Sequence, residues 1–145
     1  MPTAVLWALR DTLCIDKGEC FTNAGLATLL TLMKSNYSAL MNDEGFVIDY
    51  VLGLLTPPNH EAVAHAWLKA TRKEKVVYWD PTLQVHSPSW NLSPHNFHYQ
   101  AFHVLSAQEL SLWLREKYPD RKFTVHGIPH GDCRLPIINQ QGAIE

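Results

Sequence analysis

Hydrophobic residues in the first third of the chain follow a helical spacing. Residues 4–13 are mostly apolar and predict a short helix, which ends before a break at residues 16–18. Residues 20–34 predict a longer helix, because apolar side chains recur every three or four positions. This stripe consists of Leu26, Leu29, Leu30 and Met33, and the small residues Ala24, Gly25 and Ala27 lie on the same helix. We therefore expect another element to pack closely against this helix.

The pattern changes to strands in the middle of the chain. Residues 46–54, 63–70 and 75–79 are rich in β-branched and aromatic side chains, which predicts three strands. The last two predict a hairpin with its turn at residues 71–74. Residues 81–99 contain three prolines and many polar side chains, so we expect a loop that forms part of a binding rim.

The C-terminal part of the chain contains a helix signal and then an extended segment. Ser106, followed three residues later by Glu109, is a capping-box signature, so a helix should run over residues 107–117. Residues 122–126 predict a closing strand. The order of elements, without a repeat or a linker, predicts one α+β domain over residues 1–145. Its N-terminal helices should pack on an antiparallel β-sheet.

Composition narrows the class of protein. The chain has 145 residues, of which 46% are hydrophobic, so it can form one buried core, and its charged share of 18% leaves few surface charges. The net charge of -2 and the lack of a Lys or Arg run argue against nucleic-acid binding. The apolar stretch at residues 4–9 is too short for a signal peptide, and no segment is long enough to cross a membrane. Three cysteines, an odd number, favour reduced thiols, and we expect a cytoplasmic protein.

Cys20 is the strongest candidate for a reactive side chain. It follows Gly18 and Glu19 and begins the longer predicted helix. The free amides and the partial positive charge at a helix N-terminus favour the thiolate, which is the nucleophilic form of cysteine. The Cys20 amide could also donate a hydrogen bond to an oxyanion. Cys14 and Cys133 lack such surroundings, and we interpret both as structural or incidental.

His65 and Asp80 occupy positions that a hairpin would bring together. His65 begins one predicted strand, and Asp80 ends the next. The start of one strand lies beside the end of its antiparallel partner, so Asp80 can orient the His65 imidazole. If the strand packs on the helix, His65 can act as general base toward Cys20. Each residue alone also has a structural interpretation, as a buried thiol, a core histidine or a turn-capping carboxylate.

Four motifs in chain order resemble the transglutaminase-like core of the papain-related cysteine protease superfamily. They are Gly18-Glu19-Cys20-Phe21-Thr22-Asn23-Ala24, Tyr50-Val51-Leu52-Gly53, His65-Ala66-Trp67-Leu68 and Tyr78-Trp79-Asp80-Pro81-Thr82. The resemblance covers residues 18–82 and implies a papain-like fold with Cys20, His65 and Asp80 as a catalytic triad, and we expect no cofactor. The family contains cross-linking transferases, proteases, amidases, deamidases and members without catalysis. The resemblance therefore identifies the triad better than the reaction.

Two features depart from the family pattern. The polar connection at residues 35–45 lacks the Gly-Ile-Pro-Ala-like turn that many members have before the middle strand. The upstream Gln or Trp that often completes an oxyanion hole also has no clear counterpart. Cys14 stands where that Gln is expected, and Trp7 is a weak candidate. Efficient amide cleavage is therefore less firmly predicted than the triad itself.

Two functions remain open at this point. In the first, Cys20 attacks a peptide or side-chain amide, His65 passes a proton to the leaving amine, and Asp80 holds the imidazole. The chain would then be a protease, amidase or deamidase acting on a protein or peptide substrate. Hydrolysis is favoured over amine transfer, because a chain of this length has little room for an acceptor site. In the alternative, the same fold binds a partner protein without essential catalysis.

Other side chains also invite a functional interpretation. Trp67 and Trp79 lie on predicted strands and are candidates for a cleft wall that contacts substrate, although core packing is the simpler role. We interpret Asn23 as local hydrogen bonding or helix packing. Two histidine groups, His95 with His98 and His103, and His126 with His130 and Cys133, give no recognised zinc signature, so we expect no metal site.

Overall fold

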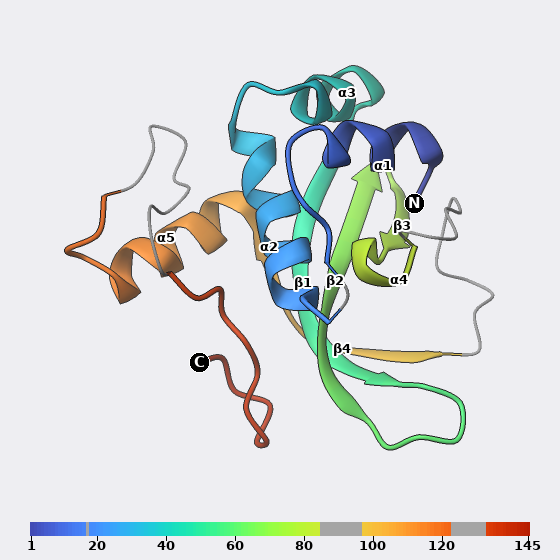
Figure 1. Cartoon of the computed structure of the whole chain (residues 1–145), viewed down its shortest axis with the longest axis vertical. Helices are drawn as coiled ribbons and strands as arrows, with labels where there is room; N and C mark the ends of the chain where they lie inside the picture. The colour runs from blue at the N-terminus through green and yellow to red at the C-terminus, as the bar shows by residue number, and fades with distance from the viewer. Residues whose placement is uncertain (17, 85–96, 123–132) are drawn as a thin grey trace.

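The predicted strands form an antiparallel sheet with one additional strand. The computed structural model describes residues 1–16, 18–84, 97–122 and 133–145. Its sheet has the strand order β3-β2-β1-β4 and contains β1 (Phe46–Thr56), β2 (Val63–Arg72), β3 (Lys75–Trp79) and β4 (His98–Ser106) (Figure 1). The helices are α1 (Thr3–Arg10), α2 (Cys20–Leu29), α3 (Asn36–Glu44), α4 (Pro81–Gln84) and α5 (Ala107–Lys117), with a short 3₁₀ helix η1 (Leu30–Leu32) after α2. The predicted α+β class is confirmed, and α2 packs on β1 and β2.

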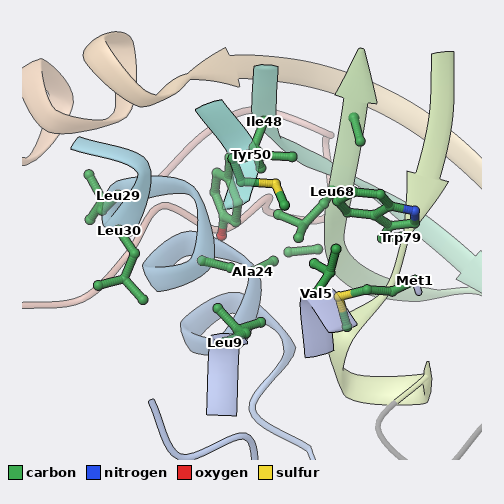
Figure 2. Packing of buried hydrophobic residues seen from close by; sticks show 14 of the residues in the cluster. Met1, Val5, Leu9, Ala24, Leu29, Leu30, Ile48, Tyr50, Leu68 and Trp79 are labelled. Atoms are coloured by element: carbon green, nitrogen blue, oxygen red, sulfur yellow. The ribbon is translucent and has the colours of Figure 1, made fainter. Parts of the chain in front are cut away.

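Every second side chain of the central strands lies on the face of the sheet that the helices cover. In β1, Ile48, Tyr50 and Leu52 are buried on this face. In β2, Leu68 pairs with Tyr50, and Ala66 pairs with Leu52. These side chains pack with residues of α1 and α2 in the main hydrophobic core. Figure 2 shows Tyr50 and Leu68 lying between the strands and the helices.

The opposite face of the sheet carries a much smaller apolar cluster. Val51 and Trp67 are buried there, and Tyr99 of β4 packs against them. Further along the same face, Val47 and Val104 are exposed. Within the described residues, this second face is therefore only partly buried.

The hairpin of β2 and β3 has the predicted turn. Arg72 pairs with Lys75, and Lys73 in the turn adopts a positive φ of 57°. The pairing ends where Leu68 meets Trp79, so the first half of β2 extends beyond the end of β3. Helices α2 and α4 both contact β2. This edge of the sheet is thus where helix termini can meet strand residues.

The polar connection at residues 35–45 forms a helix, which the sequence pattern did not predict. Ser35 caps α3, because its hydroxyl accepts a hydrogen bond from the Ser38 N–H at 3.0 Å. Gly45 ends the helix with a φ of 72°, in the left-handed region that glycine adopts at low cost. Only Tyr37 and Met41 of α3 are buried hydrophobic residues, so its apolar stripe is too short to recognise.

Three further element boundaries differ from prediction. The helix expected at residues 20–34 ends at Leu29 and continues only as η1. Strand β1 continues to Thr56, two residues beyond the predicted end at residue 54. Strand β4 begins within the segment predicted as loop. Of the predicted closing strand, residues 123–126 lie outside the described residues, and Lys122 is not in a strand.

The predicted start of α5 is confirmed. The Ser106 hydroxyl accepts from the Glu109 N–H, and the Glu109 carboxylate accepts from the Ser106 N–H, both at 3.1 Å. None of the helices in the described ranges is long and apolar enough to span a membrane.

Candidate active site

Cys20 is the first residue of α2, as predicted. The preceding Gly18 has a φ of 78°, a left-handed conformation that turns the chain into the helix. The amides of a first helical turn have no intrahelical acceptor, and their dipoles favour a negative charge there. The Cys20 side chain is 8% exposed, so the thiol is largely buried and not open to solvent in a wide cleft.

His65 and Asp80 form a direct, buried hydrogen bond. The His65 Nε2 donates to the Asp80 Oδ2 at 2.6 Å, and both residues are buried. Asp80 directly follows the last residue of β3, at the point where the strand pairing stops. The predicted contact between the start of one hairpin strand and the end of the other is therefore present.

Asp80 also caps the short helix α4. Its Oδ1 accepts from the backbone N–H groups of Thr82 at 3.1 Å and Leu83 at 3.2 Å. The Gln84 side-chain oxygen accepts from the Asp80 N–H at 2.9 Å, and Pro81 occupies the first helical position, which needs no N–H donor. The carboxylate is consequently fixed in one orientation by contacts from its own chain segment.

The electrostatics of His65 favour an imidazolium. Burial by itself lowers the pKa of His65, but hydrogen bonds to Asp80 and Cys20 and the negative charges of both groups raise it to about 9. Since Nε2 donates to Asp80, Nδ1 is the nitrogen left to face the Cys20 thiol. The three predicted residues therefore lie together, with His65 between Cys20 and Asp80.

Asn23 connects the helix that begins with Cys20 to the turn that carries Asp80. Its side-chain amide donates to the Asp16 carbonyl at 2.8 Å and to the Thr82 hydroxyl at 2.9 Å, and the residue is buried. The prediction of local bonding covers the Asp16 contact only. The bond to Thr82 holds the start of α2 against α4 and so helps to set the distance between Cys20 and Asp80.

Tyr99 is a site residue that the sequence interpretation missed. Its hydroxyl donates to the Asp80 Oδ2 at 2.9 Å, the same oxygen that His65 contacts. Burial, the charge of Asp80 and this hydrogen bond raise the pKa of Tyr99, so the phenol remains a donor. The three prolines nearby suggested a loop, but the aromatic and β-branched residues at 99–104 were the available strand signal.

Gly53 allows β4 to approach this site. A Cβ at this position would lie 2.0 Å from the Gln100 carbonyl oxygen and 2.7 Å from the Trp67 ring. Gly53 pairs with His65 on one side and with Ala101 on the other, next to an irregularity in the β4 register. A side chain here would displace Trp67 and the β4 backbone next to His65.

The two tryptophans support the site from within the protein. Trp67 is buried, stacks beside the His65 ring at 6.2 Å and meets the Tyr99 ring edge-on at 5.0 Å. Trp79 has no exposed surface and packs against Phe46 in the main core. In place of the substrate contacts expected for both, we assign Trp67 a positioning role and Trp79 a packing role.

The remaining candidates stand apart from the triad. Trp7 is 64% exposed on α1, and Cys14 is exposed with its thiol bonded to Asp16. The backbone amide of Cys20 remains the oxyanion donor that the helix geometry offers. Within the described ranges, no three His, Cys, Asp or Glu side chains are grouped to hold a metal ion. His95, His126 and His130 lie outside those ranges.

No family model, curated protein or solved structure matches this chain.

Proposed function

We propose that this protein is a cysteine-nucleophile hydrolase or acyltransferase of the transglutaminase-like, papain-related class, acting on peptide or side-chain amide bonds. The observation that carries the proposal is the buried pair of His65 and Asp80, 2.6 Å apart, beside a cysteine at a helix N-terminus. A thiol, an imidazole and a carboxylate in this order are the parts that acyl transfer requires.

The first half of the reaction forms an acyl-enzyme. The Cys20 thiolate attacks the carbonyl carbon of the amide, and the carbonyl oxygen takes the negative charge near the first-turn amides of α2. The His65 imidazolium then gives its proton to the leaving amine, and the carbon–nitrogen bond breaks. The products are the free amine and a thioester on Cys20.

The second half releases the acyl group. His65, now neutral, takes a proton from water, and the resulting hydroxide oxygen attacks the thioester carbonyl. Cys20 leaves as thiolate, and His65 is again an imidazolium. Asp80 holds the ring orientation throughout. An amine in place of water would give transfer instead of hydrolysis.

A protein-binding module is the second candidate function. It is favoured by the exposed apolar side chains on the second face of the sheet, Val47, Val76, Tyr78 and Val104. Exposed apolar side chains that share one face of a sheet are a feature of interaction sites. In this alternative the triad is retained without being essential.

Alkylation of Cys20 by iodoacetamide separates the two candidates. Second-order rates are measured between pH 4 and 10, with the modified residue identified by peptide mass spectrometry and Cys20→Ala as the control. An enzyme should react well below neutral pH, because imidazolium and helix dipole stabilise the thiolate. A reactivity that titrates near the ordinary thiol value of about 8.5 would contradict the enzymatic proposal.

A further inference from the structure

A cavity of about 630 Å³ lies between one end of the sheet and the C-terminal segment. Leu54 and Ala64 line it from β1 and β2, and Phe102 and His103 line it from β4. Its remaining wall comes mainly from residues 138–142. Its volume falls within the range of about 300–1,000 Å³ that is usual for ligand sites.

Two strands connect the cavity to the candidate active site, although Cys20, His65 and Asp80 are not among its lining residues. Ala64 directly precedes His65, and Leu54 directly follows Gly53, the residue that pairs with His65. Leu54 packs against the main core, so the cavity opens on the face of the sheet that α2 covers. One lining wall thus begins one residue before the proposed general base, whose side chain points to the opposite face of β2.

The C-terminal wall is also anchored beside the nucleophile helix. The Pro136 carbonyl accepts a hydrogen bond from the Tyr50 hydroxyl at 2.8 Å, and the Leu135 side chain packs closely on Gly25 of α2. Burial and the nearby charge of Cys20 raise the pKa of Tyr50, which places the thiol near this phenol. From Pro136 the chain continues directly into the cavity wall.

The wall is held in place by the protein itself. The His103 Nε2 donates to the Gly142 carbonyl at 2.7 Å and so ties the segment to β4. The Asn139 side-chain oxygen accepts from the N–H groups of Gln141 and Ala143, both at 3.0 Å, which closes the turn. The cavity is therefore formed before any ligand binds.

The lining chemistry indicates what this cavity can accept. Its surface combines apolar side chains with the exposed amides of Gln140 and Gln141. The described lining residues include no Asp, Glu, Lys or Arg. A charged side chain placed here would lose hydration without an ionic partner. Small residues at positions 62, 64 and 142 leave room for a main chain to pass.

We propose that this cavity binds an extended, uncharged segment of a peptide substrate, next to the amide that Cys20 attacks. The proposal rests on the proposed function, because it assigns the substrate class of the same site. It predicts selection for small or apolar side chains, with the Gln140 and Gln141 amides pairing with the substrate main chain.

Two covalent probes test the cavity separately from the thiol. Iodoacetamide reports the thiol alone: Cys20 sulfur displaces iodide and forms one sulfur–carbon bond. The tripeptide Ala-Leu-Ala chloromethyl ketone forms the same kind of bond by displacing chloride, and its rate also depends on peptide binding. Ala62→Trp, at an exposed lining position, should lower the ketone rate at least about tenfold while leaving the iodoacetamide rate unchanged.

A matched control and a wild-type comparison make the outcome decisive. Ala143→Trp makes the same exchange at an exposed position outside the lining and should change neither rate. On the unmodified protein, ketones with Glu or Lys in place of the central Leu should react at least about tenfold more slowly. Equal rates for the three ketones, or an unchanged ketone rate in Ala62→Trp, would overturn the cavity assignment. If Cys20 of the wild-type protein does not react with iodoacetamide below neutral pH, the proposed function itself would be overturned.

Discussion

The two faces of the sheet are stabilised in different ways. The face toward the helices is a continuous apolar core, in which Tyr50 and Leu68 have no exposed surface. The second face has a small aromatic cluster around Trp67, and beside it the hydrogen bonds that hold His65 and Asp80. Burial of apolar area determines the stability of the first, whereas directional contacts determine the geometry of the second.

The comparison separates the apolar core, which stabilises the fold, from the candidate reactive site. The proposed triad lies where β3 has ended and β2 continues, so α2 reaches His65 around the open edge of the sheet. Substitutions in the core should therefore reduce stability, and substitutions at the edge should mainly reduce reactivity.

The largest expected effect concerns the orientation of the imidazole. Asp80→Asn should lower the rate of acyl transfer by about 10⁴, as expected when the residue that fixes the histidine tautomer is lost. In this protein it should also destabilise the fold by about 1–3 kcal/mol, because an amide group cannot accept from all the donors around Asp80. Turnover of a labelled peptide amide and urea unfolding measure the two effects. A rate within tenfold of wild type would remove Asp80 from the mechanism.

The second prediction concerns the core face. Leu29→Ala should lower the free energy of unfolding by about 2–5 kcal/mol, because the side chain is fully buried in the main core. The alkylation rate of the folded molecules should remain unchanged. Val47→Ala is the comparison on the second face of the sheet, and since Val47 is 59% exposed it should cost less than about 0.5 kcal/mol. Similar losses in both variants would show that the faces do not differ.

The third prediction is a pH dependence of stability. The pKa of His65 is raised to about 9 in the folded protein, against an ordinary value of about 6.5 in the unfolded chain. The resulting stabilisation is fully present below about pH 6.5 and is lost as the pH rises through 9. Urea unfolding of the wild type should therefore show a decline across this window that His65→Gln lacks.

Cys20→Ala sharpens this test. Removing the thiolate takes away one of the two negative charges that raise the pKa of His65, so the decline should move to lower pH. A decline that stays in place would mean that Asp80 alone sets the charge of the imidazole.

Sequence reasoning succeeded where local order determines geometry. A helix start fixes the environment of Cys20, and the hairpin register brings His65 to Asp80 whatever else surrounds them. Both conclusions need only short-range pattern and the rules of antiparallel pairing. The class of fold followed from the same information.

It failed where contacts join segments that are distant in the chain. Tyr99 reaches Asp80 only because Gly53 lets β4 come close, and no periodicity in the sequence encodes that approach. The docking of Pro136 on Tyr50 likewise depends on a tertiary contact. Helix α3 was missed although it is a local element, because its buried face is too small to give a clear apolar pattern.

The smallest expected effect tests whether Asn23 is a positioning residue. Asn23→Ala removes the bonds to both Asp16 and Thr82, whereas Thr82→Val removes only the hydroxyl that Asn23 contacts and keeps the Thr82 N–H on Asp80. In a double-mutant cycle the two changes should couple by about 0.5–1.5 kcal/mol in unfolding free energy, the value of one buried hydrogen bond. Thr22→Val, at an exposed position of α2, is the control and should not couple.

The cycle also needs a readout at the reaction centre, because a bond that only stabilises the fold would give the same thermodynamic coupling. If Asn23 sets the distance between Cys20 and Asp80, Thr82→Val should weaken the interaction of the thiolate with the imidazolium. The pH profile of Cys20 alkylation should then shift toward the ordinary thiol range, and Asn23→Ala should give the same shift. Coupling in stability without any shift in this profile would make the Asn23 bond a structural link between α2 and α4, with no part in positioning the triad.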